Sequence, residues 1–193
     1  MIQRDSLLSL EAYAKQRSEF RAKVMEHKKS RTVRLGDNVT LLFEDELTIR
    51  YQVQEMLRIE RIFEEAGIQH ELDAYNPLVP DGSNWKATMM IEYPDEAERR
   101  RMLAALKGIE RRVWVQVAGG AEGRVYAVAD EDLERETEEK TSSVHFLRFE
   151  LDAAMREALR RGAVVKVGVD HPQYSVAAQL SPEQRAALAR DLD

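Results

Sequence analysis

The chain has 193 residues, 44% of them hydrophobic and 33% charged, so it is long enough to bury a core without disulfide bonds or a structural metal. It contains no cysteine, which excludes thiol nucleophiles, cysteine-ligated zinc and iron–sulfur clusters held by this chain. The net charge is -6, and neither a signal-peptide pattern nor an apolar run of about 18 residues is present, so we expect a cytoplasmic protein with no nucleic-acid or membrane partner.

The first 34 residues form a basic head. Apolar residues recur at helical spacing between about Ser9 and Lys29, which predicts an amphipathic helix. The head carries nine basic and four acidic residues, whereas the remaining chain carries 20 basic and 31 acidic residues. Because opposite charges attract, we expect residues 15–34 to contact an acidic protein partner or, by self-association, an acidic patch on a second copy of the chain. A solvated helix face is the alternative interpretation.

A hairpin and a long helix are predicted next. Two strand-like runs within residues 32–43 flank a turn at 36–38, whose residues tolerate positive φ. Asp45 is then expected to cap a helix over about 46–66, and Gly67 is expected to close it in the C-terminal cap position.

The order strand, helix, strand, strand then occurs twice. Asp95 is expected to cap the helix of the first unit, and Asp152 that of the second. The first unit also contains a glycine-rich turn at Gly119 and Gly120. We expect strands at 87–93, 113–117 and 124–128 in the first unit and at 143–149, 165–169 and 174–180 in the second. An internal duplication and the convergent use of a common unit both explain this pattern.

The sequence therefore predicts a single α+β domain over residues 1–193. N-terminal helices and the hairpin occupy 1–86, the first β-α-β-β unit occupies 87–140, and the second unit occupies 141–193. Because consecutive strands are usually neighbours, we expect a mainly antiparallel sheet with helices packed on one face.

One carboxylate in the helix predicted over 46–66 lies where an apolar residue is expected. On a helical wheel Val53, Leu57 and Phe63 fall on one apolar stripe, and Glu60 falls in the middle of that stripe. A buried carboxylate is costly unless it is paired, protonated or bound to a metal. Three interpretations stay open for Glu60: an arginine or tyrosine partner, a metal or catalytic role, or a wheel that does not describe the helix.

Two of the four histidines are candidate partners for Glu60. His145 shares a strand face with apolar residues, and His171 continues the alternating valines of 165–169 at the end of a strand. If both faces meet the helix that carries Glu60, the three side chains form the two-histidine, one-carboxylate set that binds iron or manganese. A hydrogen-bonded histidine at the rim of a sheet is the alternative.

Four segments together resemble a known bacterial family. They are YQVQEMLRIE at 51–60, ELDAYNPLVP at 71–80, SSVHFL at 142–147 and HPQY at 171–174, and as a set they are similar to the DUF3501 family of proteins of unknown function. The resemblance covers essentially the whole chain and implies no established activity. It does imply an association with genes for rubrerythrin-like proteins and iron–sulfur oxidoreductases, and hence with peroxide or redox metabolism.

Two functions of different class follow from the sequence. The first is a non-catalytic accessory or interaction protein, linked through the resemblance to iron–sulfur or peroxide redox metabolism. The second is a small metal-dependent enzyme or metal sensor that uses Glu60, His145 and His171 with iron or manganese. The first is favoured, because no catalytic motif is present and the charge is unevenly distributed along the chain.

Overall fold

The computed structural model describes residues 1–119 and 123–193, so Gly120 of the predicted glycine-rich turn lies outside the described residues. The α-helices are α1 (Leu10–Lys29), α2 (Glu46–Glu60), α3 (Glu65–Tyr75), α4 (Glu96–Ala105), α5 (Ala153–Arg160) and α6 (Pro182–Ala189). The strands are β1 (Thr32–Leu35), β2 (Val39–Glu44), β3 (Asn84–Ile91), β4 (Val113–Val117), β5 (Val125–Tyr126), β6 (Val128–Ala129), β7 (Val144–Glu150), β8 (Val165–His171) and β9 (Tyr174–Gln179). Short 3₁₀ helices are η1 (Arg4–Ser6), η2 (Asn76–Leu78) and η3 (Ile109–Arg112).

The strands form two sheets rather than one. The larger sheet has the order β1-β2-β3-β7-β6 and the smaller has the order β5-β4-β8-β9, and every pairing between these strands is antiparallel. The α+β class and the antiparallel character are confirmed, but the prediction of a single sheet was wrong. Apolar side chains from both sheets meet in one core, so the two apolar faces cover each other.

The two predicted β-α-β-β units distribute most of their strands in the same way. The exception is β6 of the first unit, which pairs with β7 in the larger sheet. The first strands, β3 and β7, pair in the larger sheet, while β4 and β8 pair in the smaller sheet with β5 and β9 outside them. The alternating valines of the two units face one another in the register Val113 to Val169, Val115 to Val167 and Val117 to Val165. This arrangement is compatible with two related units. The single domain and its internal boundaries stay predictions.

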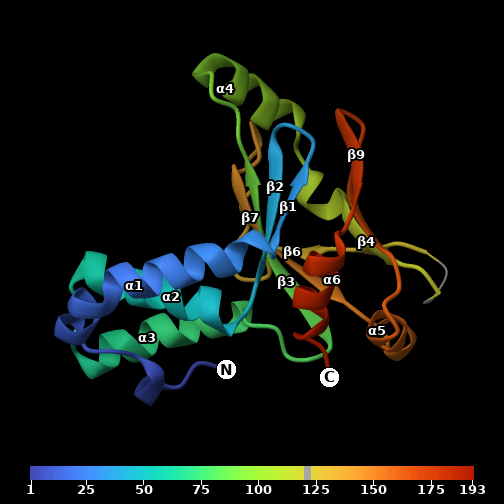
Figure 1. Cartoon of the computed structure of the whole chain (residues 1–193). Coiled ribbons are helices and arrows are strands. Elements are labelled where there is room, and N and C mark those ends of the chain that lie inside the picture. The colour runs from blue at the N-terminus through green and yellow to red at the C-terminus, as the bar shows by residue number, and fades with distance from the viewer. Residues whose placement is uncertain (120–122) are drawn as a thin grey trace.

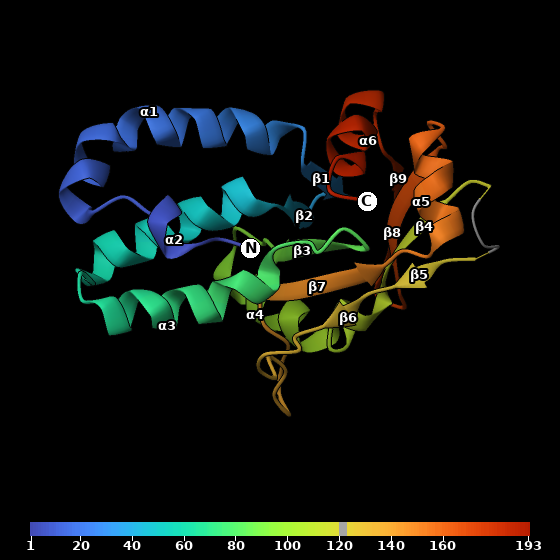
Figure 2. The same ribbon diagram turned by 90° about the horizontal axis from the view of Figure 1, so that it is seen from below.

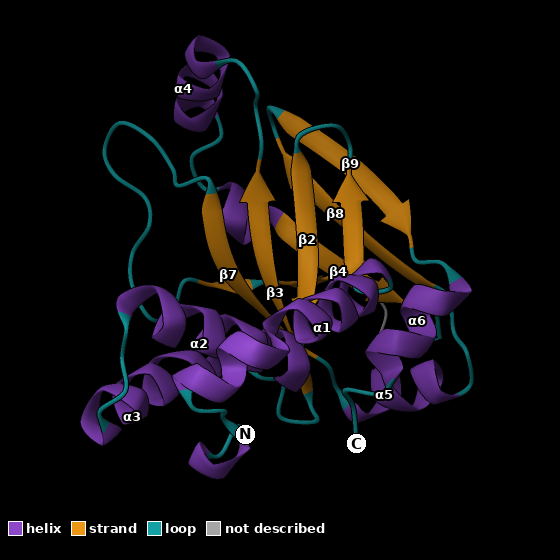
Figure 3. Ribbon diagram, turned by 60° about the vertical axis from the view of Figure 1, so that its left-hand side comes forward, coloured by secondary structure: helices purple, strands orange, loops and turns teal. Residues whose placement is uncertain are grey.

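The sequence had predicted helices packed on one face of a sheet. In the structure the helices lie near the ends of the strands instead (Figure 1, Figure 3). Helices α1, α2 and α3 form a lobe at one end, with α5 and α6 on the same side, whereas α4 lies toward the opposite end (Figure 1, Figure 3). The lobe has a small core of its own, formed by Ile49, Val53 and Leu57 of α2 with Ile68 and Leu72 of α3. Among the described helices, none combines the length and apolar character needed to cross a bilayer.

Side-chain caps fix where the helices begin. Asp45 accepts a hydrogen bond from the Thr48 N–H, and the Thr48 hydroxyl accepts one from the Asp45 N–H, which together form a capping box at the start of α2. Asp95 and Asp152 accept hydrogen bonds from main-chain N–H groups three residues on, at the starts of α4 and α5. The predicted N-terminal caps at Asp45, Asp95 and Asp152 are confirmed.

The turn of the first hairpin is held against the last strand. Gly36 has a φ of 70°, and a Cβ added there would lie 2.6 Å from the Tyr174 hydroxyl oxygen. That hydroxyl donates a hydrogen bond to the Leu35 carbonyl oxygen and accepts one from the Asn38 N–H. Both the positive φ and the close approach therefore require glycine at position 36.

Helix α2 ends earlier than the sequence predicted. The cap residue is Arg61, in the left-handed conformation with a φ of 55°, and its N–H donates to the Leu57 carbonyl oxygen. Gly67 lies inside α3 and does not close α2; a Cβ there would come within 2.7 Å of the Ile62 side chain. Phe63 therefore lies outside α2, and its side chain is 72% exposed.

Glu55 joins α1 to α2 within the lobe. Its carboxylate accepts hydrogen bonds from the Tyr13 hydroxyl at 2.7 Å and from the Arg17 guanidinium at 2.7 and 2.9 Å. Arg58, one turn further along α2, donates to the same carboxylate at 3.2 Å. The hydrogen bonds from Arg17, supported by those from Tyr13 and Arg58, lower the pKa of Glu55 from 4.5 to about 2.

We expect Arg61→Gly to stabilise the protein by about 1 kcal/mol, because glycine adopts the left-handed conformation without the steric cost that a side chain carries. The Arg61 side chain is exposed, so little packing is lost. Denaturant unfolding measures the change. Arg61→Ala is the control, since alanine keeps the steric cost, and a loss of stability in both variants would contradict the interpretation.

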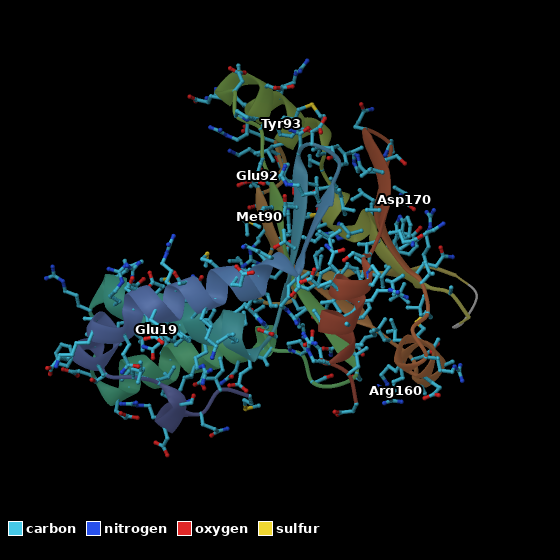
Figure 4. The ribbon with its side chains drawn as sticks, in the orientation of Figure 1. Glu19, Met90, Glu92, Tyr93, Arg160 and Asp170 are labelled. Carbon is cyan, nitrogen blue, oxygen red and sulfur yellow. The ribbon has the colours of Figure 1, made fainter. Side chains whose placement is uncertain are left out.

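We expect the stability of the protein to fall in acid partly through Glu55. Because the folded-state pKa of Glu55 is about 2 and its ordinary value is 4.5, its contribution is complete above about pH 4.5 and is lost as the pH falls toward 2. Glu55→Gln should therefore unfold at lower denaturant than the wild type at pH 7, and this difference should shrink as the pH approaches 2. Glu19→Gln, at an exposed position of α1 (Figure 4), is the control and should follow the wild type at every pH. A difference for Glu55→Gln that is constant from pH 7 to 2 would contradict the prediction.

Candidate functional site

Glu60 is exposed, so its predicted burial was wrong. It is the last residue of α2, at the free end of the lobe where the chain reverses into α3 (Figure 2). The wheel assumed a helix that continues to residue 66, but α2 ends at Glu60, so no further turn of this helix covers the carboxylate. Gln54, also on α2, is 2% exposed and exchanges hydrogen bonds with the main chain of Leu8.

His145 is fully buried in a hydrogen-bonded network. Its Nδ1 donates to the Asp130 carboxylate at 2.6 Å, and its Nε2 lies 2.9 Å from the Thr141 hydroxyl oxygen. Asp130 in turn accepts from the Phe146 N–H at 3.0 Å and pairs with Arg135 at 3.3 Å. The series of acid, histidine and hydroxyl has the order of a nucleophilic triad, but Thr141 is only 1% exposed. A hydroxyl so enclosed cannot meet a substrate, and the network instead fixes the segment 130–141 on β7.

His171 is also engaged by the protein. Its Nε2 donates to the Lys107 carbonyl oxygen at 3.0 Å, and its Nδ1 accepts from the Gln173 N–H at 3.2 Å. This pattern describes a neutral imidazole with the proton on Nε2. The ring joins the end of β8 to the segment between α4 and η3.

The structure does not bring Glu60, His145 and His171 together. The two histidines lie on the inward faces of β7 and β8, which meet the core between the sheets, whereas Glu60 lies at the free end of the lobe. Over residues 1–119 and 123–193, no group of three or more His, Cys, Asp or Glu side chains is placed to hold a metal ion. The expected iron or manganese set is therefore not formed by these three residues.

A basic cavity opens beside His171. It has a volume of about 610 Å³, and its lining includes Lys107, Arg111, Arg112 and Tyr126. The Lys107 ammonium group donates to the main-chain carbonyl oxygen of Glu138, and the Arg112 guanidinium has no hydrogen bond or ion pair to any residue that the structure describes. No carboxylate lines this cavity among the described residues. Three positive charges thus converge on a concave surface of a protein whose net charge is -6.

The outer rim of the basic cavity is rigid. The Arg124 guanidinium lies 3.9 Å from the centre of the Trp114 ring and donates to Asp170 at 3.1 Å. The Tyr126 hydroxyl donates to the same carboxylate oxygen at 2.5 Å. Figure 4 shows Asp170 beside β9, far from Glu19 on α1. These contacts hold Tyr126, which lines the cavity, against the smaller sheet.

Sequence reasoning placed the basic surface on the N-terminal head, and the structure shows that much of that charge is used internally. Arg17 pairs with Glu55, the Lys28 ammonium group lies 5.6 Å from the centre of the Tyr51 ring, and Arg31 is 1% exposed. Of the residues that line the basic cavity, sequence reasoning singled out His171 and missed Lys107, Arg111 and Arg112. The available signal was the pair Arg111 and Arg112. It lies between a glycine that follows a helix and the first residue of a strand, and such a connection lies at the end of a sheet.

We expect His145→Leu to destabilise the protein by about 3 kcal/mol, since it leaves the Asp130 carboxylate without its buried partner. The segment that Asp130 anchors should then be cleaved faster by trypsin, after Arg135 or Lys140. Denaturant unfolding and limited proteolysis measure the two effects. Val144→Leu, at a half-exposed position on the same strand, is the control, and equal stability of the two variants would show that the network does not fix this segment.

Comparisons with known proteins agree with the resemblance of the four segments. The model of a family described as "Protein of unknown function (DUF3501)" matches residues 1–192. None of the curated proteins matches the chain. A crystal structure of a novel protein of unknown function from Burkholderia pseudomallei K96243 is 60% identical in sequence, with a TM-score of 0.94, over 100% of this chain and 99% of that chain. The chain therefore belongs to the DUF3501 family.

Proposed function

We propose that this protein is a non-catalytic interaction protein that binds an acidic segment of a protein partner in the basic cavity beside His171. The observation that carries the proposal is the convergence of Lys107, Arg111 and Arg112 on one concave surface without a lining carboxylate among the described residues. Basic side chains arranged in this way attract carboxylates of a partner and guide its approach.

The chemistry of the partner follows from the charge around the cavity. A short acidic segment needs only the cavity itself, whereas a long polyanion such as a nucleic acid would also lie against the acidic remainder of the chain. A second cavity, of about 670 Å³ beside Lys86, is lined by Arg148 as well as by Asp81, Glu131 and Glu150. With charges of both signs on its walls, it selects less clearly for one kind of ligand.

The enclosure of the histidine network supports binding over catalysis. His145 and Thr141 are 0% and 1% exposed, and both ring nitrogens of His171 have partners in the protein. The link to iron–sulfur or peroxide metabolism rests on the family resemblance. Since the chain has no cysteine, an iron–sulfur centre in such a pathway would be held by the partner.

We expect a fluorescent peptide of ten glutamates to bind the wild-type protein at low salt and to dissociate as salt is raised. Arg112→Gln should weaken this binding about fivefold, since one exposed ion pair contributes up to about 1 kcal/mol. The double variant with Lys107→Gln should weaken it further. Fluorescence anisotropy measures the affinities, and analytical ultracentrifugation shows whether a second copy of the chain competes as the acidic partner.

Arg160→Gln is the matched control for this experiment. Arg160 is an exposed arginine on α5, away from Asp170 and the cavity rim (Figure 4), and its substitution changes the net charge by the same amount. Equal weakening by Arg112→Gln and Arg160→Gln would show that binding follows the overall charge, and the proposed function would then be wrong.

A further inference from the structure

A small acidic cavity shares the lining residue Arg111 with the basic cavity. Its volume is about 200 Å³, and four of its lining residues carry carboxylates: Glu110, Asp130, Glu134 and Glu136. It is formed where η3 meets the segment that follows β6. Arg111 and Arg135 also line it, so its walls carry four carboxylates and two guanidinium groups, an excess of negative charge.

Two of the four carboxylates already have partners. Asp130 accepts from His145 and the Phe146 N–H, and a Glu136 carboxylate oxygen accepts from the Gly108 N–H at 2.6 Å. Glu134 is exposed, so water can solvate it. These three residues therefore require no ligand.

Glu110 is different, because it is buried without a hydrogen bond. The residue is 2% exposed, and its Oε2 has no hydrogen-bond partner among the residues that the structure describes. Its Oε1 lies 3.6 Å from the Arg111 Nε, but the Arg111 side chain is 66% exposed and mostly solvated. A desolvated carboxylate in this position is costly unless a donor or a cation completes it.

The arginines near the cavity do not supply the Glu110 carboxylate with a hydrogen-bond donor. The Arg135 guanidinium donates to Asp130 and Asp132 and lies 4.6 Å from the centre of the Phe146 ring. A metal ion would need several closely spaced oxygen ligands, and the described residues supply no such group. An ammonium or guanidinium group needs fewer oxygen partners than a metal ion. Its N–H donors can reach one buried carboxylate and a second carboxylate at the cavity mouth.

We propose that the cavity at Glu110 binds a cationic amine, as a primary ammonium or guanidinium group, with the Glu110 carboxylate as its ion-pair partner. Glu134 lies at the exposed side of the cavity and adds a second carboxylate. The site goes beyond the proposed function, because it selects a positive ligand and uses none of the residues whose substitution tests the basic cavity.

Isothermal titration of the full-length protein with methylammonium chloride tests the proposal. Tetramethylammonium, which has no N–H donor, and methanol, which has no charge, are the ligand controls. We expect methylammonium to bind more tightly than either, and Glu110→Gln to weaken its binding at least about tenfold, because the side chain keeps its shape and loses its charge. Glu138→Gln, on the same segment and outside the cavity lining, should bind methylammonium as the wild type does.

A further arm distinguishes the source of the amine. An Nα-acetyl-lysine amide that binds more tightly than methylammonium indicates a lysine of a partner protein, whereas the reverse order indicates a free small amine. Either order supports the site if Glu110→Gln abolishes the difference. No preference for methylammonium over tetramethylammonium, or equal binding by the wild type and Glu110→Gln, would overturn the proposal.

Discussion

The buried guanidinium of Arg31 connects parts of the chain that are distant in sequence. It donates to the carbonyl oxygen of Phe43 in β2 and to that of Ala187 in α6, and it pairs with Asp191 near the C-terminus. Asp45, the cap of α2, lies 3.4 Å away. Burial raises the pKa of Asp191. Burial acts in the same direction on Asp45, but the Arg31 charge and the hydrogen bonds at the cap outweigh it and lower the pKa. One cation thus holds the lobe, the larger sheet and the C-terminal helix in register.

Local signals in the sequence were sufficient for the starts of helices and for most strands. Asp45, Asp95 and Asp152 cap helices because a short side chain satisfies a free N–H three residues on, and this depends only on neighbours in the chain. The end of α2 was not predictable in the same way, since a positive φ at Arg61 has no residue-type signal. The division into two sheets was also hidden. Alternation predicts which side of a strand is buried, but it does not say whether a helix or a second sheet covers that side.

The candidate site shows the same limit more strongly. Alternation correctly placed His145 and His171 on buried strand faces. His145 is bound by the carboxylate of Asp130, which follows β6, and His171 is bound by the main-chain carbonyl oxygen of Lys107. No pattern in the sequence predicts such contacts. The two cavities beside η3 are assembled from segments separated by up to about 60 residues. A basic or acidic group becomes part of a site there only through the fold, so a count of charges along the chain could indicate the basic head but not the basic cavity.

The distribution of both β-α-β-β units over the two sheets affects how the nascent chain folds. Each unit gives its first strand to the larger sheet and two later strands to the smaller sheet, and the first unit also gives β6 to the larger sheet, so neither unit forms a core of its own. While the ribosome is still adding β8 and β9, β4 lacks the central strand that it pairs with, and the smaller sheet cannot cover the larger one completely. Closure of the core must await the core residues of β8 and Leu188 of α6. The nascent chain therefore depends on slow, long-range pairing, and it is during this interval that a chaperone would be most needed.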